Sequence, residues 1–270
     1  MFRKYEPQSE LMRQYIQLFS LTRFDEGTDF SGRKAKAVPY GAVNLIFCFG
    51  FQFRYFNDRQ DFRVGSHLKG PSLNYYQLEH CGKIDLWVVN FKPYGFYPFI
   101  KFPVYTFYGK ILDMKEVDPA LVAIDQQLQL SPDDDERLAI LEEKIMQLFN
   151  PKRTEMEDII ASIDIIEQKQ GLLSLEELLA LHPMNPRTLE RRFRNIVGMT
   201  PKNYIRLVRF QNVLKKVRSD RSNRNWIEVA LESGYYDQPH FIRDFKEFMG
   251  NSPEVYLSKR DLLLDIFQPF

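Results

Sequence analysis

The fold of this 270-residue chain is decided by Val229-Ala-Leu-Glu-Ser-Gly-Tyr-Tyr-Asp-Gln-Pro-His-Phe-Ile-Arg-Asp-Phe245, which is followed by Gly250-Asn-Ser-Pro253. Asp237 is a residue type that caps helix N-termini, and Pro239 fits a first helical turn. Gly250 fits the end of the same helix, because glycine readily adopts the left-handed conformation of a C-terminal cap. The pattern predicts two short helices joined by a tight turn, at about Trp226–Ser233 and Gln238–Met249.

The same pattern occurs once more, 52 residues earlier in the chain. There Asn185 supplies the cap, Pro186 the first-turn proline and Gly198 the helix end. The predicted helices of this first copy are about Leu175–Leu181 and Pro186–Val197. Two short helices joined by a tight turn are the helix-turn-helix signature. An ordinary helical bundle built by duplication is the alternative.

Positive charge is concentrated around the first copy. The segment from Arg187 to Arg224 holds twelve basic and two acidic residues, a net charge of +10 in a chain whose total is +1. Such a stripe fits a polyanion, and a plain bundle gives no reason for it. The stretch Pro201–Val217 is predicted to be one helix of roughly 25 Å. Second helices held at its two ends could reach successive major grooves of one DNA duplex, which recur about every 34 Å.

The first half of the chain has a different pattern, and the fold class is therefore predicted to be α+β. Short apolar or alternating runs at Ala42–Phe49, Phe51–Tyr55 and Ile84–Phe91 predict strands of a small β-barrel or sandwich. Flanking amphipathic helices are expected between Asp118 and Phe149, the second of them starting in Ser131-Pro-Asp-Asp-Asp-Glu136. Because Asn150-Pro151 ends this pattern, we expect a β-rich domain at 1–150 and an all-α domain at 151–270.

Over roughly Met156–Leu257 the chain resembles the AraC family of bacterial transcription regulators. The resemblance is carried by the stretch quoted first, and in the first copy by Asn185-Pro-Arg-Thr-Leu-Glu-Arg-Arg-Phe193 and Gly198-Met-Thr-Pro201. The N-terminal part is similar, more loosely, to the β-rich regulatory domains of one AraC subgroup. That similarity rests on Pro39-Tyr-Gly-Ala-Val-Asn-Leu-Ile-Phe47, Val64-Gly65 and Val89-Asn-Phe-Lys-Pro-Tyr-Gly-Phe96. The resemblance implies a sequence-specific DNA-binding transcription regulator whose N-terminal domain has a sensor or oligomerisation role.

The resemblance also implies that the second helix of each copy enters the major groove. Arginine can pair with guanine through two hydrogen bonds, and glutamate can accept one from cytosine. The residues expected to face bases are Arg187, Glu190 and Arg191 in the first copy and Gln238, Pro239, His240 and Arg243 in the second. Those expected to contact phosphates are Arg194, Lys202 and Lys246. The first copy departs from the family pattern at Leu179 and Pro183, where the family favours alanine and glycine.

An aromatic cluster in the β-rich half has two readings. It could line an apolar pocket for a small-molecule effector, or it could be a packed core. The residues named for the pocket are Phe47, Phe49, Trp87, Phe91 and Tyr94, with Phe96, Tyr97 and Phe99 nearby.

Other classes of function find less support in the sequence. His67 and His80 have no third ligand at metal spacing, and no nucleophile elbow or phosphate loop occurs, so we expect neither an enzyme nor a cofactor or metal site. Cys48 and Cys81 are expected to be buried free thiols. Without a long apolar run or a signal-peptide core, a cytoplasmic protein that does not contact membranes is expected. RNA polymerase is an alternative partner through the acidic stretch 118–149, and monomer and homodimer both stay open.

Overall fold

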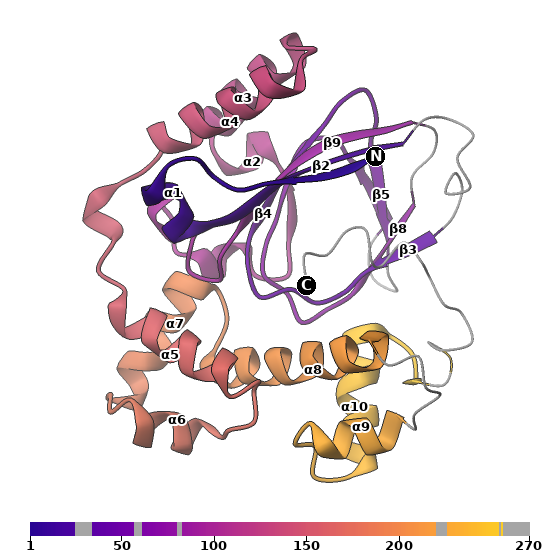
Figure 1. Ribbon diagram of the computed structural model, residues 1–270, viewed down its shortest axis with the longest axis vertical. Helices are drawn as coiled ribbons and strands as arrows, with labels where there is room; N and C mark the ends of the chain where they lie inside the picture. The colour runs from indigo at the N-terminus through magenta and orange to yellow at the C-terminus, as the bar shows by residue number, and fades with distance from the viewer. Residues whose placement is uncertain (25–33, 57–60, 80–82, 220–225, 254, 256–270) are drawn as a thin grey trace.

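The computed structural model describes residues 1–24, 34–56, 61–79, 83–219, 226–253 and 255. Its described residues form a β-rich part up to residue 150 and a helical part from residue 151 on, which lie above and below one another in Figure 1. The strands are β1 (Phe2–Tyr5), β2 (Ile16–Phe24), β3 (Lys34–Ala37), β4 (Asn44–Cys48), β5 (Phe53–Phe56), β6 (Asp61–Val64), β7 (His67–Lys69), β8 (Tyr76–Glu79), β9 (Ile84–Phe91) and β10 (Ile111–Asp113).

These strands form two antiparallel sheets, with the order β1-β2-β9-β4-β7-β10 in one and β3-β8-β5-β6 in the other. Among the described strands neither sheet closes into a barrel, so the sandwich is the better of the two forms that the sequence left open. The three strands expected from the sequence are present as β4, β5 and β9. β4 and β9 are buried along almost their whole length, which explains their nearly continuous apolar sequence.

The helices fall into two groups. Those of the β-rich part are α1 (Glu10–Tyr15), α2 (Met114–Val117), α3 (Pro119–Leu130) and α4 (Asp134–Gln147), with 3-10 turns η1 (Tyr97–Phe99) and η2 (Val104–Phe107). Those of the helical part are η3 (Pro151–Arg153), α5 (Glu157–Gln168), α6 (Leu175–Leu181), α7 (Pro186–Val197), α8 (Pro201–Ser219), α9 (Trp226–Glu232) and α10 (Gln238–Met249). No described helix is long and apolar enough to cross a membrane.

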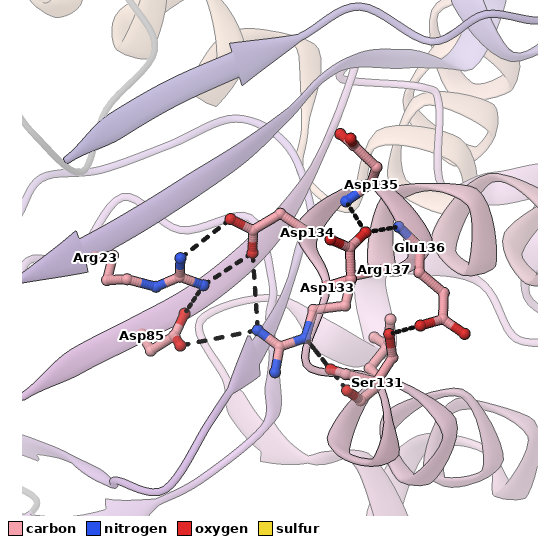
Figure 2. A network of polar contacts seen from close by, with 9 residues as sticks. Arg23, Asp85, Ser131, Asp133, Asp134, Asp135, Glu136 and Arg137 are labelled. Atoms are coloured by element: carbon pink, nitrogen blue, oxygen red, sulfur yellow. Dashed lines mark hydrogen bonds and ion pairs between the residues drawn. The ribbon is translucent and has the colours of Figure 1, made fainter.

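α4 begins slightly later than the sequence pattern suggests. Its N-cap is Asp133, whose carboxylate accepts from the backbone N–H groups of Asp135 and Glu136. Ser131 instead ends α3, and its hydroxyl donates to Glu136. A cluster of ion pairs ties the start of α4 to the six-stranded sheet (Figure 2).

The cluster in Figure 2 is centred on two arginines and two aspartates. Arg23 on β2 bonds Asp134 on α4 at 2.8 and 3.0 Å and Asp85 on β9 at 3.1 Å. Arg137 lies 3.8 Å from Asp85 and 3.9 Å from Asp134. The Arg137 guanidinium also lies 3.7 Å from the ring centroid of Phe49. Removing one partner of such a pair would leave a buried charge without its counter-ion, which is costly. The cluster therefore fixes α4 against the sheet.

The aromatic cluster is mostly packed. Phe47, Trp87 and Phe91 have no exposed surface, and Tyr5 stacks on Trp87 with centroids 5.2 Å apart. Phe49 lies under Arg137 as described above, whereas Tyr94 is only half-buried. These contacts are those of the packed-core alternative, and the effector role of the cluster stays a prediction.

One hydrophobic core runs through both parts of the molecule, from Met12 in α1 to Met249 in α10. A division of function at residue 150 therefore stays a prediction. Cys48 is a buried free thiol, and burial raises the pKa of its sulfhydryl. Cys81 and His80 lie outside the described residues. Among the described residues no group of three potential metal ligands occurs.

Candidate nucleic-acid interface

α7 presents one polar face and one buried face. Its start is fixed by Asn185, whose side chain accepts from the N–H groups of Arg187 (3.1 Å) and Thr188 (3.2 Å), and its end by Gly198 at φ +90°. Leu189 and Phe193 lie on the buried face of the helix. The opposite face is exposed and carries the four expected contact residues Arg187, Glu190, Arg191 and Arg194.

α10 repeats this arrangement. Asp237 accepts from the N–H of His240 at 2.8 Å, and Gly250 ends the helix at φ +72°. Phe241 and Phe245 are buried on its inner side. Of the expected contact residues, His240 is half-buried with its ring centroid 5.1 Å from that of Tyr235, and the others are exposed, namely Gln238, Pro239, Arg243 and Lys246.

α8 is the long helix that joins the two units, and Lys202 is exposed near its N-terminus. Arg206 on α8 donates to Asp244 and to Glu247 on α10, both at 2.7 Å. Burial by itself lowers the pKa of Arg206, but the two carboxylates outweigh it and raise the pKa above its ordinary value. Since Asp244 is almost fully buried, this arginine is needed to neutralise it.

Two further arginines of the basic segment also have partners inside the protein. Arg192 on α7 donates to Asp158 on α5 at 2.7 Å. Arg209 on α8 donates to the carbonyl oxygens of Gly171 and Leu173. The net charge of +10 therefore overstates what is available to a polyanion, because these groups are engaged in holding helices together.

The turns of the two units differ in length. In the first unit four residues (182–185) join α6 to α7, and in the second unit five residues (233–237) join α9 to α10. Gly234 adopts a left-handed φ of +79° in the longer turn, whereas His182 in the shorter turn has φ −133°. The sequence departure at Leu179 and Pro183 thus coincides with a one-residue deletion in the turn.

The β-rich part borders the edge of the exposed face of α7. Tyr105 of η2 borders a hollow of about 550 Å³ together with Arg187, Glu190 and Arg191. The guanidinium of Arg194 lies 5.6 Å from the Tyr105 ring centroid. Tyr105 is not predictable from the sequence, because nothing local in the chain brings it to α7.

A second missed residue is Tyr236, which is 91% exposed directly before the N-cap of α10. Its neighbour Tyr235 is buried against Phe241, and burial raises the pKa of the Tyr235 hydroxyl. The pair of tyrosines in the turn is a sequence signal, but only the structure distinguishes the packed ring from the exposed one.

Both second helices end on the same loop of the β-rich part, which runs between β7 and β8. A Cβ atom at Gly198 would lie 2.7 Å from Pro71, and one at Gly250 would collide with the ring of Tyr75. The glycines therefore allow a close approach as well as the left-handed turn. The β-rich part contacts both units at equivalent points.

Comparison with known proteins identifies similar chains for both parts. Residues 180–259 match a family described as a helix-turn-helix domain, and residues 3–113 match a domain of unknown function (DUF6597). The HTH-type transcriptional activator AarP of Providencia stuartii is 30% identical over 111 residues, covering 40% of this chain and 81% of that protein.

Other similar proteins are longer or more distant. The XylDLEGF operon transcriptional activator 1 of Pseudomonas putida is 28% identical over 117 residues, which are 43% of this chain and 35% of that protein. The chain thus spans about a third of this relative and 37% of an uncharacterized HTH-type transcriptional regulator of Haemophilus influenzae. The solved structure of ToxT from Vibrio cholerae has a TM-score of 0.49 at 9% identity, covering 89% of this chain and 97% of ToxT.

Proposed function

Since this chain belongs to the AraC family of transcription regulators, we propose that it binds duplex DNA at specific sequences and so regulates bacterial transcription. The observation that carries the proposal is the pair of capped helices, α7 and α10. Each buries an apolar face and exposes a polar face at equivalent positions. A major groove accepts one such helix.

We assign base contacts to the outer face of each helix. Glu190 and Arg191 lie about one turn after Arg187 on α7, so the three side chains can reach neighbouring base pairs of one groove segment. On α10 the corresponding residues are Gln238, Pro239, His240 and Arg243. Pro239 has no N–H and can offer only an apolar contact, for example to a thymine methyl group.

Phosphate contacts would fix the register of the protein on the duplex. We assign them to three exposed residues, Arg194 on α7, Lys202 at the start of α8 and Lys246 on α10. Tyr105 and Tyr236 join this group as exposed hydroxyl donors beside α7 and before α10. Such contacts make binding weaken steeply as salt is added.

The β-rich part would act as the regulatory domain, with residues 151–270 as the DNA-binding domain. The contact of η2 with α7 and the close approach of the β-rich part to Gly198 and Gly250 support this role, because a shift of the β-rich part would move both second helices. Since the relatives are named activators and regulators, a regulator acting on cytoplasmic DNA is proposed rather than an enzyme. Contact with RNA polymerase and the choice between monomer and homodimer stay predictions.

The test is in-vitro selection of duplexes from a random DNA library with the full chain. We expect an enriched site with two preferred segments about one helical turn apart. A chain in which Arg191 and Arg243 are both alanine serves as the control, and it should enrich nothing related. Recovery of unrelated sequences by the unaltered chain would refute sequence-specific binding.

A further inference from the structure

A cavity of about 350 Å³ lies between the β-rich part and helices α5 and α8. Figure 1 shows these two helices directly below the β-rich part. Cavities that hold small ligands start at about 300 Å³, so this one suits a single compact molecule. It is separate from the DNA-facing surfaces of α7 and α10.

Opposite charges line the cavity from its two sides. Lys92 belongs to the turn after β9, and Asp164 belongs to α5. Within the described part of the chain neither side chain forms a hydrogen bond or an ion pair. Lys92 is half-buried and Asp164 is exposed, so solvent reaches both charges and each is available to a charged ligand in the cavity.

The position of Lys92 is fixed by its backbone. Its N–H donates to the Tyr15 carbonyl at 2.9 Å, and its carbonyl accepts from the Gly95 N–H at 2.8 Å, which closes a tight turn. On the other side, α5 is held to α7 by the ion pair between Asp158 and Arg192. The cavity therefore has two firmly anchored charged walls.

The remaining polar groups of the cavity are largely satisfied. The hydroxyl of Tyr204 donates to Glu167 at 2.6 Å, and the hydroxyl of Tyr40 donates to Gln17 at 3.2 Å. The rings of Tyr40, Tyr94 and Tyr204 supply an aromatic lining. What the cavity offers to a ligand is thus one cation, the carboxylates of Asp164 and Glu167, and aromatic surface.

We propose that this cavity binds a small zwitterion of the amino-acid class, bridging the β-rich and helical parts. The carboxylate of the ligand pairs with Lys92, its ammonium group pairs with Asp164 and Glu167, and its side chain packs on the tyrosine rings. Binding stabilises the present arrangement of the two parts. Any effect of the ligand on DNA binding rests on the proposed function, whereas the existence of the ligand-binding site does not.

The test screens the full chain with the twenty L-amino acids and γ-aminobutyrate, measuring the thermal midpoint and then Kd by calorimetry. Each binder is compared with the amine that lacks its carboxylate and the acid that lacks its ammonium group. We expect at least one amino acid to bind, and both truncated compounds to bind about 10- to 100-fold more weakly, because each has lost a charge-assisted contact.

Variants locate the site. Lys92→Met and Asp164→Asn should each weaken binding of that amino acid by a similar factor, whereas Lys110→Met and Asp135→Asn, which are exposed outside the cavity, should leave Kd unchanged. Circular dichroism checks that each variant is folded. The comparison with truncated compounds uses the unaltered chain and stands even if a variant does not fold.

Three results would overturn the site: no compound of the panel binds, a truncated compound binds as tightly as its parent, or binding survives both cavity substitutions. Binding of the chain to its selected DNA duplex is measured separately, with no amino acid present. If the chain binds the duplex but none of the amino acids, only this inference is overturned. If the chain binds an amino acid but not the duplex, only the proposed function is overturned.

Discussion

Arg191 and Arg243 occupy equivalent exposed positions on the two second helices. Replacing either by alanine removes a side chain that can form two hydrogen bonds with guanine. We expect each change to cost about 1–3 kcal/mol of binding free energy on the selected site and to relax the preference at one base pair. Competition binding with single-base variants of the site measures both effects. If neither substitution alters base preference, the orientation of the helices in the groove is wrong.

Lys202 is a contrasting case at the same scale, because its expected partner is a phosphate. Lys202→Ala should weaken binding to all duplexes by a similar factor and reduce the slope of log K against log salt by about 1. Titrations at several salt concentrations with one specific and one unrelated duplex provide the measurement. A loss confined to the specific duplex would assign Lys202 to base reading.

His67 affects stability rather than binding. It is fully buried, its Nδ1–H donates to the Gly65 carbonyl, and its Nε2 accepts from the Tyr55 hydroxyl at 3.0 Å. Burial lowers the pKa of His67 to about 4, from an ordinary value of 6.5. Between pH 6.5 and 4 the unfolded chain therefore binds a proton at His67 that the folded chain does not bind. The free energy of unfolding falls as the pH drops through this range.

The loss attributable to His67 is about 1.4 kcal/mol for each pH unit over this range. In His67→Gln the free energy of unfolding, measured with urea, should fall less steeply with acid than in the unaltered chain. His182→Gln, which changes a histidine with exposed surface, is the matched control. Equal slopes for His67→Gln and the unaltered chain would show that His67 does not resist protonation.

At the scale of elements, the contact between α8 and α10 depends on Arg206. Arg206→Met keeps the aliphatic stem over Phe248 but leaves Asp244 buried without its cation. We expect a loss of about 2–4 kcal/mol in the free energy of unfolding. The double variant with Asp244→Asn should recover part of it, because the stranded charge is gone. A double variant no more stable than Arg206→Met would mean that the ion pair is not what joins these helices.

The boundaries of α7 and α10 are predictable from sequence because their signals are local. Asn185, Asp237, Gly198 and Gly250 each act within one turn of the helix they cap. The roles of the basic residues are not predictable in this way. Arg206 meets its carboxylates 38 and 41 residues along the chain, so only the folded structure separates it from exposed neighbours such as Lys202.

The shorter turn of the first unit is a further feature that cannot be seen from the 52-residue sequence repeat. Matching the second helices at an interval of 52 residues aligns their caps and glycines but places the first helices one residue out of register. The two units therefore share the capping residues and terminal glycine of the second helix. They differ in the length of the turn that joins the first helix to it. The position of Tyr105 beside α7 escapes the sequence for another reason, since it depends on how the β-rich part packs.

At the scale of the whole molecule, the two parts share one core and contact each other at several points. Gly41 of the β-rich part lies so close to Tyr204 on α8 that a Cβ atom there would be 2.8 Å from the ring. Gln211 on α8 donates to the Pro39 carbonyl at 3.2 Å. Together with the contacts at Gly198 and Gly250, these make the position of the β-rich part a determinant of where α7 and α10 lie.

This shared core predicts that both parts unfold together. The chain has two tryptophans, Trp87 in β9 and Trp226 in α9, and both are buried. The variants Trp87→Phe and Trp226→Phe each leave one fluorophore, which reports on one part. In each single-tryptophan variant, we expect the urea midpoint from fluorescence to coincide with that from far-ultraviolet circular dichroism of the whole chain, because coincident transitions mark a cooperative unit. A helical part that unfolds at lower urea than the β-rich part would show that the interface adds little stability, and that the β-rich part is poorly coupled to α7 and α10.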